Sequence, residues 1–300
     1  MRSPRLGLCC LFVDEPIKFR TTTATSLLKL APEARAVKLS ALCLENAQAL
    51  MAALQYCDRT GIGCFRVNSQ ILPVKTHPQT GYRVDDLPEA AAIVEAFRAC
   101  GSFARARDIR TVFHPDQFVV INSNRPDVVE KSIDELDYQA EVAEWINADV
   151  LNVHIGGVYG DKASAVETFC RRLELLPDRA RRRLTVENDD KSFAPADMIA
   201  ACRTNGVPLV YDVHHHRCLA DGLSVEEATE AALTTWDREP LFHISSPIDG
   251  WDGPKPLRHH DEIDPRDFPD CWRGREITVE VEAKAKERAV RNLAAALALA

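Results

Sequence analysis

The chain alternates short apolar runs with amphipathic segments eight times, and this alternation limits the folds open to it. The amphipathic segments have the i, i+3, i+4 spacing of helices, whereas the apolar runs are β-branched and typical of strands buried on both faces. The runs cover residues 5–10, 64–69, 109–114, 149–155, 183–188, 208–213, 240–245 and 276–282. No G-x-G-x-x-G follows the first run, so an open dinucleotide-binding sheet is disfavoured. We therefore predict an α/β fold, a (β/α)8 TIM barrel with its active site at the carboxyl ends of the strands.

Length and composition agree with this architecture. The chain has 300 residues, of which 46% are hydrophobic, and barrels of this kind typically have about 250. No composition break divides the chain, so we expect one barrel domain over 1–300. Helix signals are clear at three places: a division near Pro32, a capping box at Ser224 and Glu227, and a stop at Asn205-Gly206.

Composition also excludes some classes of protein. There is no apolar stretch of 18 residues and no signal-peptide pattern, so we predict a cytoplasmic protein without membrane contact, and we expect a monomer. The ten cysteines include no C-x-x-C pair and are predicted to be reduced thiols. A net charge of −8 argues against a simple nucleic-acid binder. Bound divalent cations would lower that negative field locally.

Histidines and carboxylates gather at the ends of the predicted strands. All nine histidines except His77 end a run or follow one. In a barrel these ends meet at one rim. The candidates at or just after strand ends are His114, His154, Glu187, Asp212, His215, His243 and Glu282, with His259 and His260 together in the loop after the seventh run. Glu280, two residues before Glu282 and on the same strand face, is a competing acid.

Several candidates have a simpler structural interpretation. His114 could be a turn histidine beside Pro115, and His154 a satisfied core histidine. A carboxylate such as Glu187 at the end of an apolar strand is costly to bury unless it is paired or bound to metal.

The stretch PLVYDVHHHR poses its own question. The D-x-x-H spacing of Asp212 and His215 at a strand exit favours a ligand pair. His214 and His216 are weaker candidates, because three consecutive side chains cannot all point at one centre.

Together the set predicts a metal centre. Imidazole with carboxylate and no thiolate favours Mn²⁺, with Zn²⁺, Mg²⁺ or Fe²⁺ as alternatives. The ligands exceed the needs of one ion, so we expect two or three. Ions about 3.5–4 Å apart suit in-line displacement at phosphorus.

Seven motifs resemble, in order and spacing, those of the UV-damage endonuclease family: TVFHPDQFVVINS, LNVHIGGVYGDK, LTVENDD, VYDVHHH, FHISSP, RHHDEID and VEVEAKAKE. The matches run from about residue 5 to residue 287. The resemblance implies a TIM barrel similar to endonuclease IV and the xylose-isomerase-like barrels. It also implies up to three Mn²⁺ ions and a nick in damaged double-stranded DNA immediately 5′ of a photolesion or abasic site.

Position by position, the resemblance makes eight residues the metal ligands: His114, His154, Glu187, Asp212, His215, His243, His259 and Glu282. His259 is preferred to His260 because HHDEID aligns best with an H-x-D pattern. Among the eight, we predict catalytic roles for Glu187, His243 and Glu282. It places Gln117 and Phe118 where the family inserts a Gln-Tyr pair into the duplex. A core position before VVIN is the alternative for Phe118. Lys284 and Lys286, after the last strand, could hold phosphates, with solvated surface lysines as the alternative.

Three departures from the family pattern bear on ion number and lesion specificity. Leu241 stands where the family has a carboxylated lysine, so the ligand set of one ion is incomplete. Leu8 and Phe12 match a Tyr and an Asn that line the lesion pocket, and Phe118 replaces a tyrosine. The alternative functions are a sugar isomerase or epimerase, an iron-dependent oxidative enzyme, and a lesion binder without catalysis.

Overall fold

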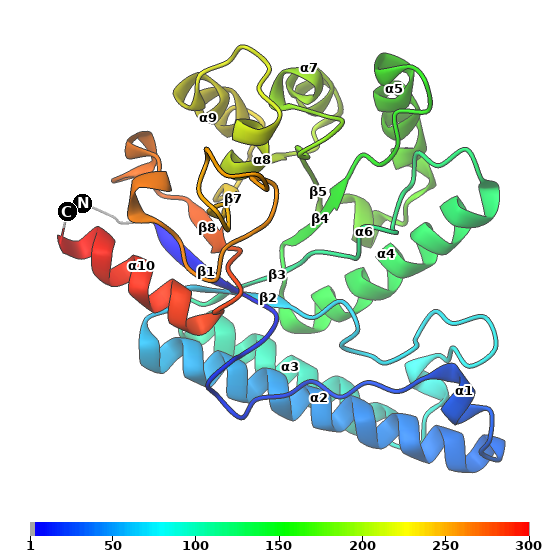
Figure 1. Cartoon of the computed structure of the whole chain (residues 1–300). Helices are drawn as coiled ribbons and strands as arrows, with labels where there is room; N and C mark the ends of the chain where they lie inside the picture. Colours follow the sequence, from blue (N-terminus) through cyan, green and yellow to red (C-terminus); the bar gives the residue numbers. More distant parts are fainter. Residues whose placement is uncertain (1–3, 300) are drawn as a thin grey trace.

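The computed structural model describes residues 4–299, in which eight parallel strands form a closed barrel in sequence order (Figure 1). The strands are β1 (Arg5–Cys9), β2 (Cys64–Val67), β3 (Arg110–Phe113), β4 (Val150–His154), β5 (Leu184–Glu187), β6 (Leu209–Asp212), β7 (Leu241–Ile244) and β8 (Thr278–Val281). Every strand lies inside its predicted run, and β8 pairs with β1 to close the barrel. The predicted TIM barrel is confirmed.

Helices surround the barrel (Figure 1). The longer ones are α2 (Pro32–Thr60), α3 (Ala90–Ala106), α4 (Pro126–Ile146), α5 (Lys162–Arg172), α7 (Pro195–Asn205), α9 (Val225–Leu233) and α10 (Glu287–Leu299). The short ones are α1 (Ala24–Leu27), α6 (Asp178–Arg181) and α8 (Val213–Cys218), with 3-10 turns at Val84–Asp86, Leu173–Leu175, Pro265–Asp267 and Asp270–Trp272. None of the helices within residues 4–299 is long and apolar enough to cross a membrane.

The predicted helix boundaries hold. α2 begins at Pro32, and Ser224 caps α9 in a reciprocal capping box with Glu227. Gly206 ends α7 with φ 63°, a left-handed conformation that glycine adopts without steric cost. All ten cysteines are free thiols, as predicted.

The barrel interior has an apolar layer followed by a polar one. The apolar layer contains Cys64, Val112, Val150, Val210 and Leu241 from five of the strands. The next inward positions carry charged or imidazole side chains, among them Glu187 and His243. The apolar layer therefore forms the floor of a polar cup that opens at the carboxyl rim.

Candidate metal centre

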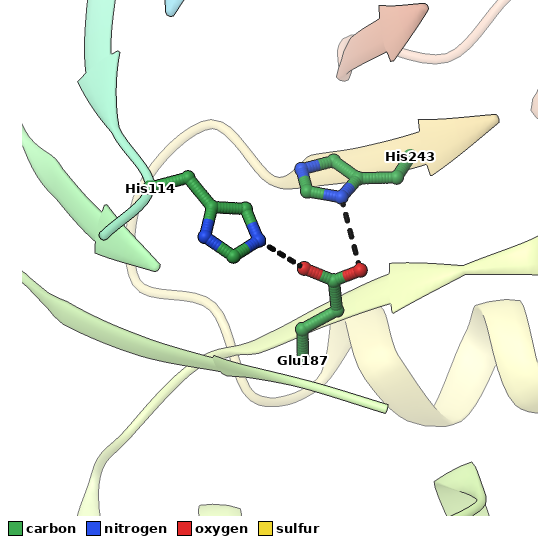
Figure 2. Close-up of side chains that lie close together, drawn as sticks. All are labelled: His114, Glu187 and His243. Carbon is green, nitrogen blue, oxygen red and sulfur yellow. Dashed lines mark hydrogen bonds and ion pairs between the residues drawn. The ribbon is translucent and has the colours of Figure 1, made fainter. Parts of the chain in front are cut away.

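Glu187, at the end of β5, lies at the middle of the polar cup and is only 1% exposed. Its Oε2 accepts a hydrogen bond from Asn152 Nδ2 at 2.5 Å and lies 3.0 Å from His114 Nε2. Its Oε1 lies 3.2 Å from His243 Nδ1 and 3.3 Å from His215 Nδ1. Figure 2 shows His114 and His243 reaching this carboxylate from different strands. One carboxylate thus contacts imidazoles from three elements.

The D-x-x-H spacing of Asp212 and His215 reflects a helix cap. β6 runs directly into α8, and Asp212 caps that helix by accepting a hydrogen bond from His215 N at 2.7 Å. A cap and the residue three positions later face each other, so His215 is turned toward Glu187.

The other two histidines of the triplet point elsewhere. His214 Nδ1 lies 3.2 Å from the Ser245 carbonyl oxygen. His216 is held between Tyr211 Oη at 2.8 Å and Asp221 Oδ1 at 2.9 Å. His216 thus has both ring nitrogens engaged away from Glu187, whereas His214 Nε2 is buried without a hydrogen-bond partner.

The remaining predicted ligands lie at the edge of the same cluster. His154 Nε2 is 3.9 Å from Glu187 Oε2, and His259 Nδ1 is 3.8 Å from Glu282 Oε2. Glu282 Oε1 is 3.5 Å from His243 Nδ1. Residues from six strand ends, helix α8 and one loop therefore meet at one place. Three triads have donor atoms within 4.8 Å of one another: His114 with Glu187 and His243, Glu187 with Asp212 and His215, and Asp212 with His243 and Glu282.

These residues fit a bound cation. His154 Nδ1, Asp212 Oδ2 and His243 Nδ1 are buried without a hydrogen-bond partner, and each unpaired buried group costs about 1–3 kcal/mol. Two imidazoles are already oriented for ligation. His114 Nδ1 lies 3.0 Å from the Pro115 carbonyl oxygen and His243 Nε2 lies 2.8 Å from Glu280 Oε2, which leaves the other nitrogen of each ring facing Glu187.

The electrostatics of the cluster favour positive charge. Burial alone would raise the pKa of Glu187, but His243, His154 and their neighbours hold it well below its usual value. Burial would lower the pKa of His243, yet Glu187 above all raises it to about 10. Protons on histidine thus balance the carboxylates, and a divalent ion could replace those protons.

Two further buried charges lie in the cup. Arg66 was not predicted as a site residue from the sequence, and Glu280 was considered only as an alternative to Glu282. Arg66 of β2 lies with Nη2 2.5 Å from Glu280 Oε2 and Nη1 2.7 Å from Glu282 Oε1. Glu280 Oε2 therefore contacts both Arg66 and His243. The arginine within the otherwise apolar run CFRVNS could have indicated a buried charge in the barrel, just as the glutamate within LTVEN does.

Phe118 is not a core residue, because its side chain is 77% exposed on the loop after β3. It borders two rim cavities, of about 530 Å³ and about 640 Å³. Gln117, also exposed, lines the smaller one beside His114. Lys284 is exposed and Lys286 half-buried after β8. All four residues lie at the rim, and their roles stay predictions.

The residues that depart from the family pattern, Leu241, Leu8 and Phe12, lie in different parts of the structure. Leu241 belongs to the apolar floor beneath the cup and offers no ligand atom. Leu8 is fully buried in the main core, and Phe12 packs against Tyr56 and Phe65 with ring centroids 5.3 Å and 6.0 Å away. Leu8 and Phe12 are thus core-packing residues. Cys10 is the first-loop residue that lines the smaller rim cavity.

Comparisons with known proteins identify the family of the chain and its fold. The model of the UV-endonuclease UvdE family matches residues 4–300. A UV DNA damage endonuclease of Deinococcus radiodurans is 32% identical over 97% of this chain and 94% of its own, and one of Bacillus cereus is 32% identical over 76% and 72%. The crystal structure of SacUVDE superposes with TM-score 0.87 at 27% identity over 99% of this chain and 98% of its own. Endonuclease IV of Thermus thermophilus, at 18% identity over 99% of this chain and all of its own and TM-score 0.59, shares the fold.

Proposed function

Because the chain belongs to the UV-endonuclease UvdE family, we propose that it is a metal-dependent DNA-repair endonuclease that cuts the backbone 5′ of a UV photolesion or abasic site. A DNA endonuclease is the coarse function that this membership supports. The observation that carries the finer proposal is the cluster around Glu187, in which buried acids and imidazoles from several strands present unpaired donor atoms to one another.

Each part of the rim has a role in this proposal. Damaged double-stranded DNA lies across the rim, where Gln117 and Phe118 enter the duplex at the lesion and Lys284 and Lys286 contact phosphates. The eight predicted ligands hold the ions, with Glu187, His243 and Glu282 nearest the reacting phosphate. When bound, divalent ions would activate water and hold the leaving oxygen. We further propose one domain acting as a monomer; its cytoplasmic location stays a prediction.

We infer that the centre holds two ions. His243 belongs to two of the three triads, but its Nε2 faces Glu280, and the single nitrogen left can bind one ion. Leu241 adds no ligand, and the Arg66 guanidinium already brings a positive charge to Glu282. Equilibrium dialysis with Mn²⁺ followed by elemental analysis should give two ions per chain. Three would refute this count.

Metal removal tests the function itself. We expect the Mn²⁺-loaded protein to nick ultraviolet-irradiated supercoiled plasmid and to leave unirradiated plasmid intact. EDTA should abolish nicking and added Mn²⁺ should restore it, as measured by conversion to the open-circular form on a gel. Failure to nick irradiated plasmid with either Mn²⁺ or Mg²⁺ would contradict the proposal and reopen the sugar isomerase and oxidative alternatives.

Metal binding should depend on pH with a definite sign. The pKa of His243 is raised to about 10 without metal, so at neutral pH an ion must displace its proton. Apparent Mn²⁺ affinity should therefore rise with pH between 6 and 8, by about tenfold per unit for each displaced proton. Calorimetry in two buffers of different ionisation enthalpy measures the protons released. No proton release would show that His243 is not a ligand.

A further inference from the structure

Tyr159, on the loop between β4 and α5, has both an exposed side chain and an unusual backbone conformation. Its side chain is 49% exposed, and its backbone is left-handed with φ 50°. Left-handed backbone is uncommon for residues other than glycine, and strained, exposed residues gather at binding sites. The loop follows His154, so Tyr159 lies on the same rim as the candidate metal centre.

Two glycines support the ring. A Cβ on Gly157 would come within 2.7 Å of Tyr159 Cζ, so the ring lies directly against the backbone at that position. Gly156 has φ 110°, and a Cβ there would come within 2.1 Å of Val120 Cγ1. The glycine pair therefore lets the Tyr159 ring and the loop after β3 both pack against one short segment.

The loops that carry Phe118 and Tyr159 are joined into one unit. Asn122 Nδ2, beyond Phe118, donates to the Gly157 carbonyl oxygen at 2.8 Å. Arg172 of α5 donates to the Ile121 and Ser123 carbonyl oxygens, each at 2.7 Å. Both loops leave adjacent strands. Phe118 and Tyr159 are thus two exposed aromatic rings on a single cross-braced platform, formed by the loops that follow His114 and His154.

We propose that Tyr159 is a second DNA contact, whose ring stacks on a nucleobase beside the step that Phe118 enters. This inference rests on the proposed function. Stacking is the contact that a fixed, exposed aromatic ring offers to any base, whatever the sequence. Two rings on one rigid platform hold neighbouring parts of a distorted duplex at a fixed separation from the metal ligands, which positions the phosphate for cleavage.

The test compares Tyr159→Ala, Tyr159→Phe and Tyr159→Leu with a matched control, Leu175→Ala, which removes another exposed apolar side chain. Binding to a short duplex with an abasic-site analogue is measured by fluorescence anisotropy, with Ca²⁺ in place of Mn²⁺ to prevent cleavage. Tyr159→Ala and Tyr159→Leu should weaken binding about 5- to 100-fold. Tyr159→Phe and Leu175→Ala should stay within about twofold of wild type. A 2-aminopurine beside the lesion should be quenched by wild type and less by Tyr159→Ala.

Other results distinguish a failure of the Tyr159 inference from a failure of the proposed function. Wild-type affinity and quenching in Tyr159→Ala, while wild type still nicks irradiated plasmid, would overturn this inference and leave the proposed function standing. Full recovery by Tyr159→Leu would also overturn it, since leucine restores bulk without an aromatic face. Unchanged Mn²⁺ stoichiometry and melting temperature would show that the platform stays folded. If wild type neither binds nor nicks damaged DNA, both proposals fail.

Discussion

Glu187→Gln should abolish nicking of irradiated plasmid. The substitution keeps the side chain's size but removes the charge that His114, His215 and His243 surround. A neutral amide is a poor ligand for a divalent ion, and the ions are proposed to supply several kcal/mol of transition-state stabilisation. A loss of about 4 kcal/mol corresponds to about a 1,000-fold slower rate. Initial nicking rates at saturating Mn²⁺ measure the effect.

The matched control is Glu174→Gln, an exposed glutamate in the 3-10 turn after α5. It should nick at the wild-type rate. Elemental analysis of both variants after dialysis against Mn²⁺ separates a lost ion from a lost fold, and circular dichroism reports the fold directly. Wild-type nicking by Glu187→Gln would refute the assigned centre.

The barrel and most of the centre were predictable because they depend on local sequence. Buried parallel strands are continuous apolar runs, and closing them into a barrel brings every carboxyl end to one rim. His114, Glu187 and Asp212 therefore meet wherever their strands end. Among the three consecutive histidines, the D-x-x-H spacing already favours His215 as the one that turns inward. That choice follows from Asp212 capping α8, which selects His215.

Contacts across the barrel were not predictable from local sequence. Arg66 and Glu280 lie on strands separated by β1, and their side chains meet because Gly7 leaves room between them. A Cβ on Gly7 would lie 3.1 Å from Cys64 Cβ and 3.2 Å from Glu280 Cγ. Phe118 shows a second limit. An aromatic residue before an apolar stretch is also typical of a core, so a core position stayed open as the alternative to the duplex insertion that the family resemblance implies. The course of the loop, which exposes Phe118, decides against the core.

Arg66→Met should destabilise the metal-free protein by about 3–5 kcal/mol, the cost of leaving a buried charge without its partner. Glu280 is 0% exposed. Burial would raise its pKa, but Arg66 with His243 holds that pKa at about 2. Without the guanidinium, Glu280 keeps only the His243 imidazole, 2.8 Å away, as a charged partner, and Glu282 loses its contact with Arg66 at 2.7 Å. The two acids must then stay incompletely paired in a buried site or take up a proton. Urea unfolding monitored by circular dichroism, in EDTA, measures the loss.

The double variant Arg66→Met with Glu280→Met separates charge from packing. Replacing both members of a buried pair by apolar residues is often nearly neutral, so part of the lost stability should return. Glu282 and His243 each lose one contact in the double variant and account for the remainder. Arg110→Met is the control for removing an arginine from the barrel, because its partner Asp149 is partly exposed and a solvated acid tolerates the loss. An equal loss in Arg110→Met would mean that arginine packing, not the Glu280 charge, sets the effect.

Mn²⁺ should raise the melting temperature of Arg66→Met by more than it raises that of wild type. The guanidinium lies 2.7 Å from Glu282 Oε1, so wild type already has a cation at that carboxylate. In the variant this position is open, and a bound ion can supply the missing charge, giving a larger rise in melting temperature with Mn²⁺. An equal rise in both proteins would show that Arg66 does not stand in for an ion, and the argument for a two-ion centre would lose its electrostatic basis.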